Sequence, residues 1–444
     1  MTSTPAITAP TGDTQAGDTA RPAHGRIGFV VLGSIVGGLA AGVLLDLLVF
    51  GGSSESTITG LALISLAFGF ALLALLSSWR TSQPQRWAIQ PAVWIGVAGS
   101  AIVVTKPGTH TLDLAGWVWP VLLVVGVVWM ERQARRALRH RSRLALLNSA
   151  FALLTLVAIG GAYETVAAAT ASSSRPVSGH VYAVGGHSLY LNCSGRGAPT
   201  VVLFNGLGER AANWARVQSN VAGTTRVCSF DRAGEGLSGP APRRQDGREL
   251  AADLNALLAE AHEPAPYVLA GHSVGGTYAL VYAHQYSRQV AGVALVDSST
   301  PYQFDLPAYP SFYSTWNRVS ALFPTMARAG LSRIFGLGSP KAVRADRTEF
   351  EELPTAFKQA RALTTLGSKP LVVLTAGRGQ QAGWSASQDK LALLSSSHAH
   401  RTIRGATHTA LLDDQYFAQL TSAGIKAVVA GARSGVSLTS GSYP

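Results

Sequence analysis

The stretch Tyr267-Val268-Leu269-Ala270-Gly271-His272-Ser273-Val274-Gly275 decides the fold class of the second half of this 444-residue chain. Its first four residues form a short apolar run of the kind found in buried strands, and its last five are the only G-x-S-x-G pattern in the chain. A helix-like run follows from Gly276 to Tyr282. The order of strand, glycine-bounded serine and helix predicts a sharp turn that exposes the Ser273 hydroxyl at the carboxyl end of a sheet.

The glycines of this turn have a steric role. Side chains at Gly271 or Gly275 would collide with the neighbouring strand and helix, so a strained elbow at Ser273 requires both. The N-terminus of the following helix would stabilise negative charge that develops beside the serine. A flexible Gly-Ser turn is the alternative interpretation, and the flanking strand and helix patterns favour a nucleophile.

A serine hydroxyl is a weak nucleophile and needs an oriented base beside it. Among the 11 histidines, His408 follows the last expected strand and lies downstream of Ser273. We predict that His408 is the base, with a plain surface histidine as the alternative. His272 adjoins the serine, but the turn should direct its side chain elsewhere, and His398 and His400 are nearby competitors.

The carboxylate that would orient the base has two candidates. Asp297 ends the apolar run Val290–Val296, and the carboxyl edge of a parallel sheet is where such a residue can reach a base. Asp389 is the alternative, because it is the first carboxylate after the next strand at residues 371–375. We favour Asp297 as the acid. The alternative role for Asp297 is structural, as a strand-end aspartate that only caps the following turn.

Acyl transfer also needs hydrogen-bond donors aimed at the oxyanion. The backbone N–H of Val274 is one candidate. The loop 205–208, which follows the strand Thr200–Phe204, can supply the other from Leu207, with Gly206 beside it. As a bare glycine turn this loop would carry no function.

Short apolar runs that alternate with helical patterns predict an α/β layer fold with a mostly parallel sheet. The runs lie at residues 181–184, 188–193, 200–204, 226–230, 267–270, 290–296, 371–375 and 400–403, and the first two form a hairpin around Gly185-Gly186. We expect this domain to span residues 179–431, after a linker at 171–178 and before a disordered tail at 432–444.

The first part of the chain has a different character. The chain is 47% hydrophobic and 14% charged, and nearly all its long uncharged runs precede residue 170. We expect residues 1–25 to be disordered and residues 26–170 to form a transmembrane α-helical bundle, since about 20 apolar residues cross a bilayer. The runs lie at 28–50, 58–77, 88–104, 112–130 and 144–162, and the third, opened by Pro91, is the weakest span.

The net charge of +12 would ordinarily suggest nucleic-acid binding, but six arginines between residues 132 and 143 lie together between the fourth and fifth apolar runs. Basic loops beside membrane spans face the cytoplasm, so we attribute this charge to topology and expect no nucleic-acid partner. Because the cluster directly precedes the last span, the domain after that span should be extracytoplasmic.

Two further features of the bundle allow alternatives. Asp46 and Glu164 lie near the outer ends of their spans, which favours interfacial solvation over a polar pathway across the membrane. The small-xxx-small spacings among Gly33, Gly37, Gly38 and Gly42 favour close helix packing within the bundle over dimerisation.

Over roughly residues 179–430 the chain resembles the α/β-hydrolase superfamily of esterase-like, lipase-like and peptidase-like serine hydrolases. The elbow at Ser273 and the segments 230–238 and 293–301 carry the resemblance, and the order Ser273, Asp297, His408 is the family order. The chain departs from the pattern in having Asn205 where lipases often carry His, and in lacking an acid directly after the seventh strand.

The resemblance implies a fold and an activity. It implies an α/β hydrolase fold with a helical lid at about 301–368, and cleavage of a small-molecule or lipid-like ester, or of an amide, by a Ser-His-Asp triad through an acyl-enzyme. No metal and no organic cofactor is needed, and no particular oligomeric state follows. A non-catalytic hydrolase-fold module that binds or senses a ligand is the alternative.

The resemblance also bears on the two cysteines. The family topology places the second strand antiparallel beside the fourth, and these strands carry Cys193 and Cys228. A cross-strand disulfide is therefore reachable, and an extracytoplasmic location would preserve it. Two separate buried thiols are equally compatible with the sequence.

Overall fold

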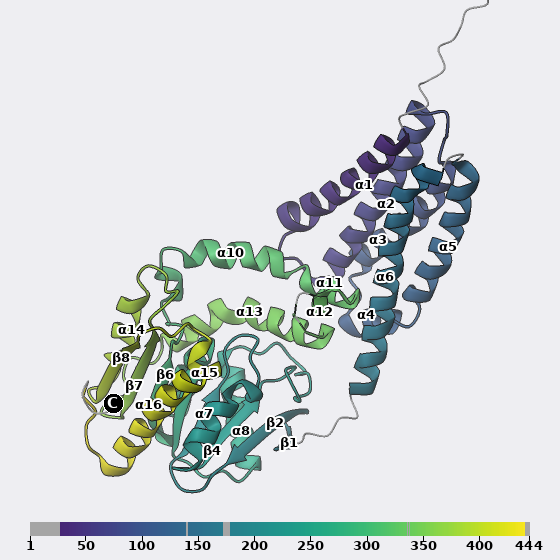
Figure 1. Cartoon of the computed structure of the whole chain (residues 1–444). Coiled ribbons are helices and arrows are strands. Elements are labelled where there is room, and N and C mark those ends of the chain that lie inside the picture. Colours follow the sequence, from purple (N-terminus) through teal and green to yellow (C-terminus); the bar gives the residue numbers. More distant parts are fainter. Residues whose placement is uncertain (1–26, 139–140, 172–177, 335, 337, 440–444) are drawn as a thin grey trace, which may run out of the picture.

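The computed structural model describes residues 27–138, 141–171, 178–334, 336 and 338–439. A helical bundle formed by residues 27–171 lies beside a sheet domain formed by residues 178–439 (Figure 1). The predicted disordered N-terminus and most of the predicted linker at 171–178 lie outside the described residues.

The bundle contains segments that are long and apolar enough to cross a membrane. Its elements are α1 (Ile27–Val43) continued by the π-helix η1 (Leu44–Val49), α2 (Glu55–Arg80), η2 (Arg86–Ala88), α3 (Ile89–Thr105), α4 (Thr109–Ala115), α5 (Trp119–Ala137) and α6 (Arg141–Ala171). Within the described residues, four segments qualify as spans: Ile27–Val49, Glu55–Arg80, Arg86–Thr105 and Ala145–Thr170. The pair α4 and α5, bent by 47°, would make a fifth.

The third apolar run forms a continuous helix and, as predicted, is the least apolar of the four qualifying spans. Pro91 lies in the first turn of α3, where its missing N–H removes no hydrogen bond of the helix, so the run from Arg86 to Thr105 continues without a break. The interruption falls in the fourth run, where α4 ends at Ala115 and α5 begins at Trp119.

Asp46 and Glu164, for which we expected solvation at the ends of their spans, are both buried. Asp46 in η1 is only 6% exposed, and its Oδ1 atom has no hydrogen-bond partner among the described residues. Glu164 in α6 is 3% exposed and forms an ion pair with Arg333 of the sheet domain. Gly37, Gly38 and Gly42 lie against α2 as predicted, and a Cβ at Gly38 would lie 3.1 Å from the Cα of Gly69, whereas Gly33 has no atom within 4 Å of its Cβ position.

An eight-stranded sheet with the order β1-β2-β4-β3-β5-β6-β7-β8 forms the second body. The strands are β1 (His180–Val184), β2 (His187–Ser194), β3 (Thr200–Phe204), β4 (Val227–Asp231), β5 (Tyr267–His272), β6 (Val290–Val296), β7 (Leu371–Ala376) and β8 (His398–Ile403). β2 pairs antiparallel with β1 and β4, and the remaining pairs are parallel. The predicted mostly parallel sheet is confirmed.

Helices cover both faces of the sheet. They are η3 (Ala211–Trp214), α7 (Ala215–Ala222), α8 (Gly247–Glu260), α9 (Val274–Gln285), η4 (Ser287–Gln289), α14 (Trp384–Ala392), α15 (Ala410–Asp413) and α16 (Gln415–Ser434). Because side chains alternate along a strand, Val202 and Phe204 join the core that contains α8 and α9. Val201 and Leu203 join the opposite core, which contains α7 and α16. The result is a three-layer fold in which the loops after the carboxyl ends of the parallel strands all lie at one edge of the sheet.

The chain stays part of the fold beyond residue 431, where we expected a disordered tail. α16 continues to Ser434 and ends at Gly435, whose φ of 69° stops the helix. The N–H of Leu438 then donates to Ser397 Oγ at 2.8 Å, and the Leu438 side chain is buried. Residues 440–444 lie outside the described part of the chain.

A helical insertion between β6 and β7 occupies the segment predicted as a lid. It comprises η5 (Gln303–Asp305), α10 (Tyr309–Ser320), α11 (Phe323–Arg328), α12 (Leu331–Ile334) and α13 (Pro340–Ala360). In Figure 1 these helices lie between the sheet and the bundle, with α11 and α12 against the bundle. The insertion therefore contacts both bodies of the molecule.

Arginines of the insertion contact acidic residues at the end of the bundle that faces it. Arg328 Nε lies 2.5 Å from Glu55 Oε1, and both Arg328 and Arg344 reach Asp113 Oδ1, at 2.8 and 2.6 Å. Arg333 pairs with Glu164 as described above. These contacts are partly shielded from water, since the side chains of Arg328 and Glu55 are 12% and 9% exposed.

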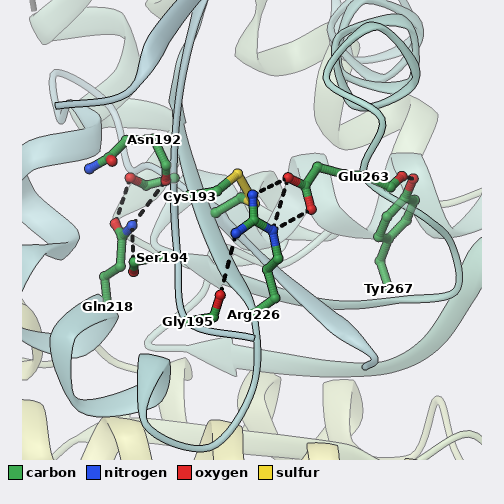
Figure 2. Close-up of a disulfide and its surroundings, with 10 residues drawn as sticks. Asn192, Cys193, Ser194, Gly195, Gln218, Arg226, Glu263 and Tyr267 are labelled. Atoms are coloured by element: carbon green, nitrogen blue, oxygen red, sulfur yellow. Dashed lines mark hydrogen bonds and ion pairs between the residues drawn. A yellow bond between two sulfur atoms is a disulfide. The ribbon is translucent and has the colours of Figure 1, made fainter. Parts of the chain in front are cut away.

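A disulfide joins Cys193 of β2 to Cys228 of β4. The two residues are direct partners in the antiparallel register, with their Cα atoms 4.0 Å apart. Figure 2 shows the ion pair of Arg226 and Glu263 beside this disulfide, with Arg226 Nη2 and Glu263 Oε1 2.5 Å apart. The sequence had left a disulfide and two free thiols equally open.

Candidate active site

Ser273 lies on a strained turn between β5 and α9. Its backbone has φ 55° and ψ −128°, a conformation that residues other than glycine rarely adopt. The surrounding backbone holds it there, because the Ser273 N–H donates to Val296 O at 3.1 Å and its carbonyl accepts from Ser299 N–H at 2.9 Å. The turn places Ser273 at the carboxyl edge of the sheet.

The glycines around Ser273 leave no room for a side chain. A Cβ at Gly275 would lie 2.3 Å from the carbonyl oxygen of Phe204 in β3, and one at Gly271 would lie 2.5 Å from the Cα of Gly276. These contacts provide the steric reason that we predicted for both glycines. The elbow thus depends on close backbone packing of α9 against both β3 and β5.

His408 and Asp297 meet at the same edge of the sheet. His408 lies between β8 and α15, and its Nδ1 is 2.6 Å from Asp297 Oδ2. Asp297 directly follows β6, whose last residue Val296 pairs in register with His272, the neighbour of Ser273. Ser273 and Asp297 therefore follow the neighbouring strands β5 and β6, and His408 follows β8, which is separated from β6 by β7.

Asp297 is a buried carboxylate with several donors. Besides His408 it accepts hydrogen bonds from the Ala376 N–H at 3.1 Å, Trp384 Nε1 at 2.8 Å and the Gln380 side chain. Burial alone would raise the pKa of Asp297, but the bonds and charge from His408, together with those from Trp384 and Ala376, hold it below its ordinary value. The carboxylate form is thus the stable one beside the imidazole.

Asp389, the alternative acid, lies elsewhere. Its Oδ1 contacts His400 Nδ1 at 2.7 Å, and its side chain is 66% exposed. His400 itself lies in β8, as expected, and His398 contacts the carbonyl of Ser395. Neither competitor histidine forms the contact with Asp297 that His408 makes.

The candidate oxyanion donors differ from one another. The N–H of Gly206 donates to Glu209 Oε2 at 2.5 Å, so it is not free for a substrate, contrary to our expectation. Within the part of the chain that the structure describes, the N–H groups of Leu207 and Val274 donate to no acceptor. Val274 is the first residue of α9, where helix geometry leaves the N–H unpaired. Leu207 and Val274 thus remain the two candidates.

A second pair of a histidine and a carboxylate, His272 and Glu209, lies beside the candidate triad and was not predicted. His272 is fully buried, with Nδ1 2.7 Å from Glu209 Oε1 and Nε2 3.0 Å from the carbonyl oxygen of His408. Both ring nitrogens thus face acceptors. Burial lowers the pKa of His272, but the Glu209 charge and hydrogen bond outweigh it and raise the pKa overall. The same pairing holds the pKa of Glu209 below its ordinary value despite burial.

Arg232, which follows β4, supports the loop that carries the oxyanion candidates. Its guanidinium donates to the carbonyl oxygens of Asn205 and Gly206 at 2.6 and 2.8 Å. The side chains of Glu235 and Glu349 contact the buried guanidinium at 3.0 and 2.8 Å. The segment 230–238, noted in the sequence for its resemblance only, therefore fixes the backbone opposite Ser273.

Among the described residues, one cluster of metal-ligating side chains is compact enough to hold an ion: Cys193, Cys228 and Glu263. Its two sulfur atoms are bonded to each other, so they offer no thiolate. The cluster lies at the disulfide of Figure 2 and not at Ser273.

Comparison with known proteins identifies the sheet domain. Residues 199–334 match a family model described as the alpha/beta hydrolase fold. The sheet domain has the α/β hydrolase fold. The match covers the elbow and Asp297 of the hydrolase domain and part of its helical insertion.

Two curated relatives align with parts of the chain. An uncharacterized protein of Schizosaccharomyces pombe is 27% identical over 211 residues, which are 43% of this chain and 39% of that protein. The dihydrolipoyllysine-residue acetyltransferase component of the acetoin cleaving system of Pseudomonas putida is 35% identical over 122 residues, 26% of this chain and 31% of that protein. The chain thus spans well under half the length of these relatives.

Among solved structures, the hydrolase domain is similar to a thermophilic esterase from Thermogutta terrifontis. The identity is 19%, the TM-score is 0.45, and the alignment covers 58% of this chain and 100% of that chain.

Proposed function

We propose that this protein is a membrane-anchored serine hydrolase that cleaves ester-type bonds. One observation carries the proposal: the 2.6 Å contact between His408 Nδ1 and Asp297 Oδ2 lies at the sheet edge where the strained elbow presents Ser273. An acid that holds Nδ1 leaves the other imidazole nitrogen to serve as a base. Amide bonds suit the same groups.

The reaction follows from these positions. His408 Nε2 takes the proton of Ser273 Oγ as the oxygen attacks the substrate carbonyl, and the N–H groups of Val274 and Leu207 stabilise the oxyanion. His408 then gives the proton to the leaving alcohol, and the acyl group stays on Ser273. Water then attacks the acyl-enzyme as His408 takes its proton, and His408 returns that proton to Ser273 Oγ as the carboxylic acid leaves.

The distribution of charge along the bundle supports the membrane anchor and its orientation. α6 runs from the arginine-rich end of the bundle, distant from the sheet, to the end beside the hydrolase domain (Figure 1). The acidic residues Glu55, Asp113 and Glu164 lie at that second end, against the insertion. Since basic loops stay in the cytoplasm, the hydrolase domain is extracytoplasmic. A disulfide in this domain suits an oxidising compartment.

Reaction of the full-length protein with a fluorophosphonate probe tests the proposal. The probe should label the wild-type chain at Ser273, and the Ser273→Ala variant should lose both labelling and the hydrolysis of short nitrophenyl esters. Ser287→Ala, which changes an exposed serine of η4, should keep both. A folded wild-type protein that resists the probe would instead indicate a hydrolase-fold module that binds or senses a ligand.

A further inference from the structure

A groove of about 460 Å³ lies among helices α1, α2 and α6 of the bundle. Its lining is mainly apolar and includes Ile35, Phe70 and Leu154, and Leu322 of the insertion also borders it. Leu39 and Val43 line the groove as well and are 67% and 55% exposed, so the groove opens to the surroundings of the bundle. This volume suits a small ligand, and the lining favours a hydrocarbon chain.

Two polar groups in this apolar lining have no partner. Asp46 and Ser65 border the groove and are 6% and 3% exposed. Among the described residues, neither Asp46 Oδ1 nor Ser65 Oγ forms a hydrogen bond. Ser34, which also lines the groove, differs because its hydroxyl donates to the Val30 carbonyl at 2.7 Å. Buried polar groups in proteins are normally satisfied, so Asp46 and Ser65 indicate an absent partner.

The backbone at Asp46 is also unusual. Residues Leu44–Val49 form the π-helix η1, and π-helical turns occur frequently at functional sites. Gly42, one turn earlier, leaves space beside Ser65, since a Cβ at this position would lie 3.6 Å from Ser65 Cβ. At Gly38 a Cβ would instead meet the Gly69 backbone at 3.1 Å. The helices thus pack tightly at Gly38 and separate toward Asp46.

We propose that this groove binds a lipid-like amphiphile, with its acyl chain along the apolar lining and a hydrogen-bond donor of its head group at Asp46. A hydroxyl or an ammonium group supplies that donor, and a hydroxyl also exchanges a hydrogen bond with Ser65. This inference rests on the proposed insertion of the bundle into a membrane, where such amphiphiles are abundant. It does not depend on the chemistry at Ser273.

Photolabelling of the full-length Ser273→Ala protein in detergent tests the proposal, because this variant cannot turn the ligand over. The probe is a monoacylglycerol with a diazirine in its acyl chain, and the labelled peptides are identified by mass spectrometry. Competitors of equal chain length are a monoacylglycerol, an alkylamine and a fatty acid methyl ester, which lacks a donor. We expect the probe to label α1, α2 or α6. The monoacylglycerol or the alkylamine should displace it, and the methyl ester should not.

Variants locate the site. Gly42→Phe fills the groove and should abolish labelling, whereas Gly33→Phe is the matched control, because Gly33 has no atom near its Cβ position and does not line the groove. Asp46→Leu should raise the half-saturating probe concentration about tenfold, as for one lost hydrogen bond. Asp46→Asn keeps an acceptor, so it should retain the hydroxyl amphiphile and weaken the alkylamine.

Two outcomes would overturn the proposal. The first is that the methyl ester displaces the probe as effectively as the hydroxyl and ammonium competitors do. The other is unchanged labelling in Gly42→Phe. The competitor comparison uses an unaltered groove, so it decides the question even if a groove variant fails to fold. Fluorophosphonate labelling of Ser273 in the wild-type chain reports separately on the hydrolase.

Discussion

The imidazole rings of His272 and His408 lie 4.4 Å apart between their centroids, with 34° between their planes. The buried ring of His272 therefore packs against the partly exposed ring of His408. Since Glu209 holds one nitrogen of His272 and the backbone of His408 takes the other, His272 connects the loop after β3 with the loop after β8. We regard His272 and Glu209 as positioning residues for the proposed base.

Replacement of Glu209 by Gln should change stability in a pH-dependent way. Because the pKa of His272 is raised in the folded state, its interaction with Glu209 stabilises the fold fully below the ordinary pKa of 6.5. This stability is lost as the pH rises through the higher pKa of the folded state. Because the pKa of Glu209 is lowered in the folded state, its ionised form stabilises the fold fully above the ordinary pKa of 4.5. This stability is lost as the pH falls through the lower pKa of the folded state. The loss in Glu209→Gln, about 3 kcal/mol, should be greatest between those two pH values.

Thermal unfolding of the full chain in detergent, at several pH values, measures this effect. Glu260→Gln, at the exposed end of α8, is the control and should give a small difference at every pH. A stability difference for Glu209→Gln that stays constant from pH 4 to 9 would contradict the ion pair.

The two candidate acids can be separated by activity. Asp297→Asn removes the charge beside His408 and should lower kcat for a nitrophenyl ester by about 10⁴-fold, because the imidazole loses both its orientation and its stabilised cation. Asp389→Asn affects only the exposed contact with His400 and should leave kcat within about twofold. Equal losses in the two variants would refute the assignment of Asp297.

The elbow should not tolerate the smallest side chain. Gly275→Ala places a methyl group 2.3 Å from the Phe204 carbonyl, so β3 and α9 must move apart. We expect a loss of about 1–3 kcal/mol in the free energy of unfolding, together with loss of fluorophosphonate labelling. Gly223→Ala, where no atom lies within 4 Å of the new Cβ, is the matched control. Labelling that survives in Gly275→Ala would show that the elbow is more plastic than its packing indicates.

The disulfide should stabilise the hydrolase domain. It closes a loop of 35 residues, for which chain entropy gives about 3–4 kcal/mol. The double variant Cys193→Ala/Cys228→Ala should unfold at a lower temperature, with dithiothreitol producing the same shift in the wild-type chain and none in the variant. An unchanged unfolding temperature would show that this bond adds nothing to the fold.

The contact between the insertion and the bundle should protect α11 from exchange. Arg328→Gln leaves Glu55 without its closest cation and should lower the local opening free energy of residues 323–328 by about 1–3 kcal/mol. Hydrogen exchange followed by mass spectrometry measures this, with Arg288→Gln, at the exposed turn η4, as the control. Equal exchange in both variants would mean that the ion pairs do not hold the insertion.

The sequence predicted those parts of the fold that depend on local pattern. Strands buried on both faces, such as Val290–Val296, are continuous apolar runs, so their ends fall within two residues of the prediction. The elbow was recognisable because its steric requirement is local to Gly271 and Gly275. The bend before Trp119 was missed, because composition alone did not distinguish a continuous span from a broken one.

Contacts between distant loops could not be predicted in this way. Glu209 and His272 are 63 residues apart, and neither carries a local signal of the other. The available hint was position, since Glu209 follows the end of β3 closely and His272 adjoins the proposed nucleophile. Likewise, Arg328 and Arg344 have the composition of a solvated helix face until the fold brings Asp113 beside them.

The insertion gives the hydrolase domain a second attachment to the bundle besides the covalent connection before β1. Five of its arginines, Arg318, Arg328, Arg333, Arg344 and Arg347, reach groups of the bundle. A fragment that begins at residue 178 would lack these partners, so its insertion would lose the ion pairs and hydrogen bonds that hold it to the bundle. Ligands selected on such a fragment would therefore meet an insertion without the contacts that it makes in the intact protein.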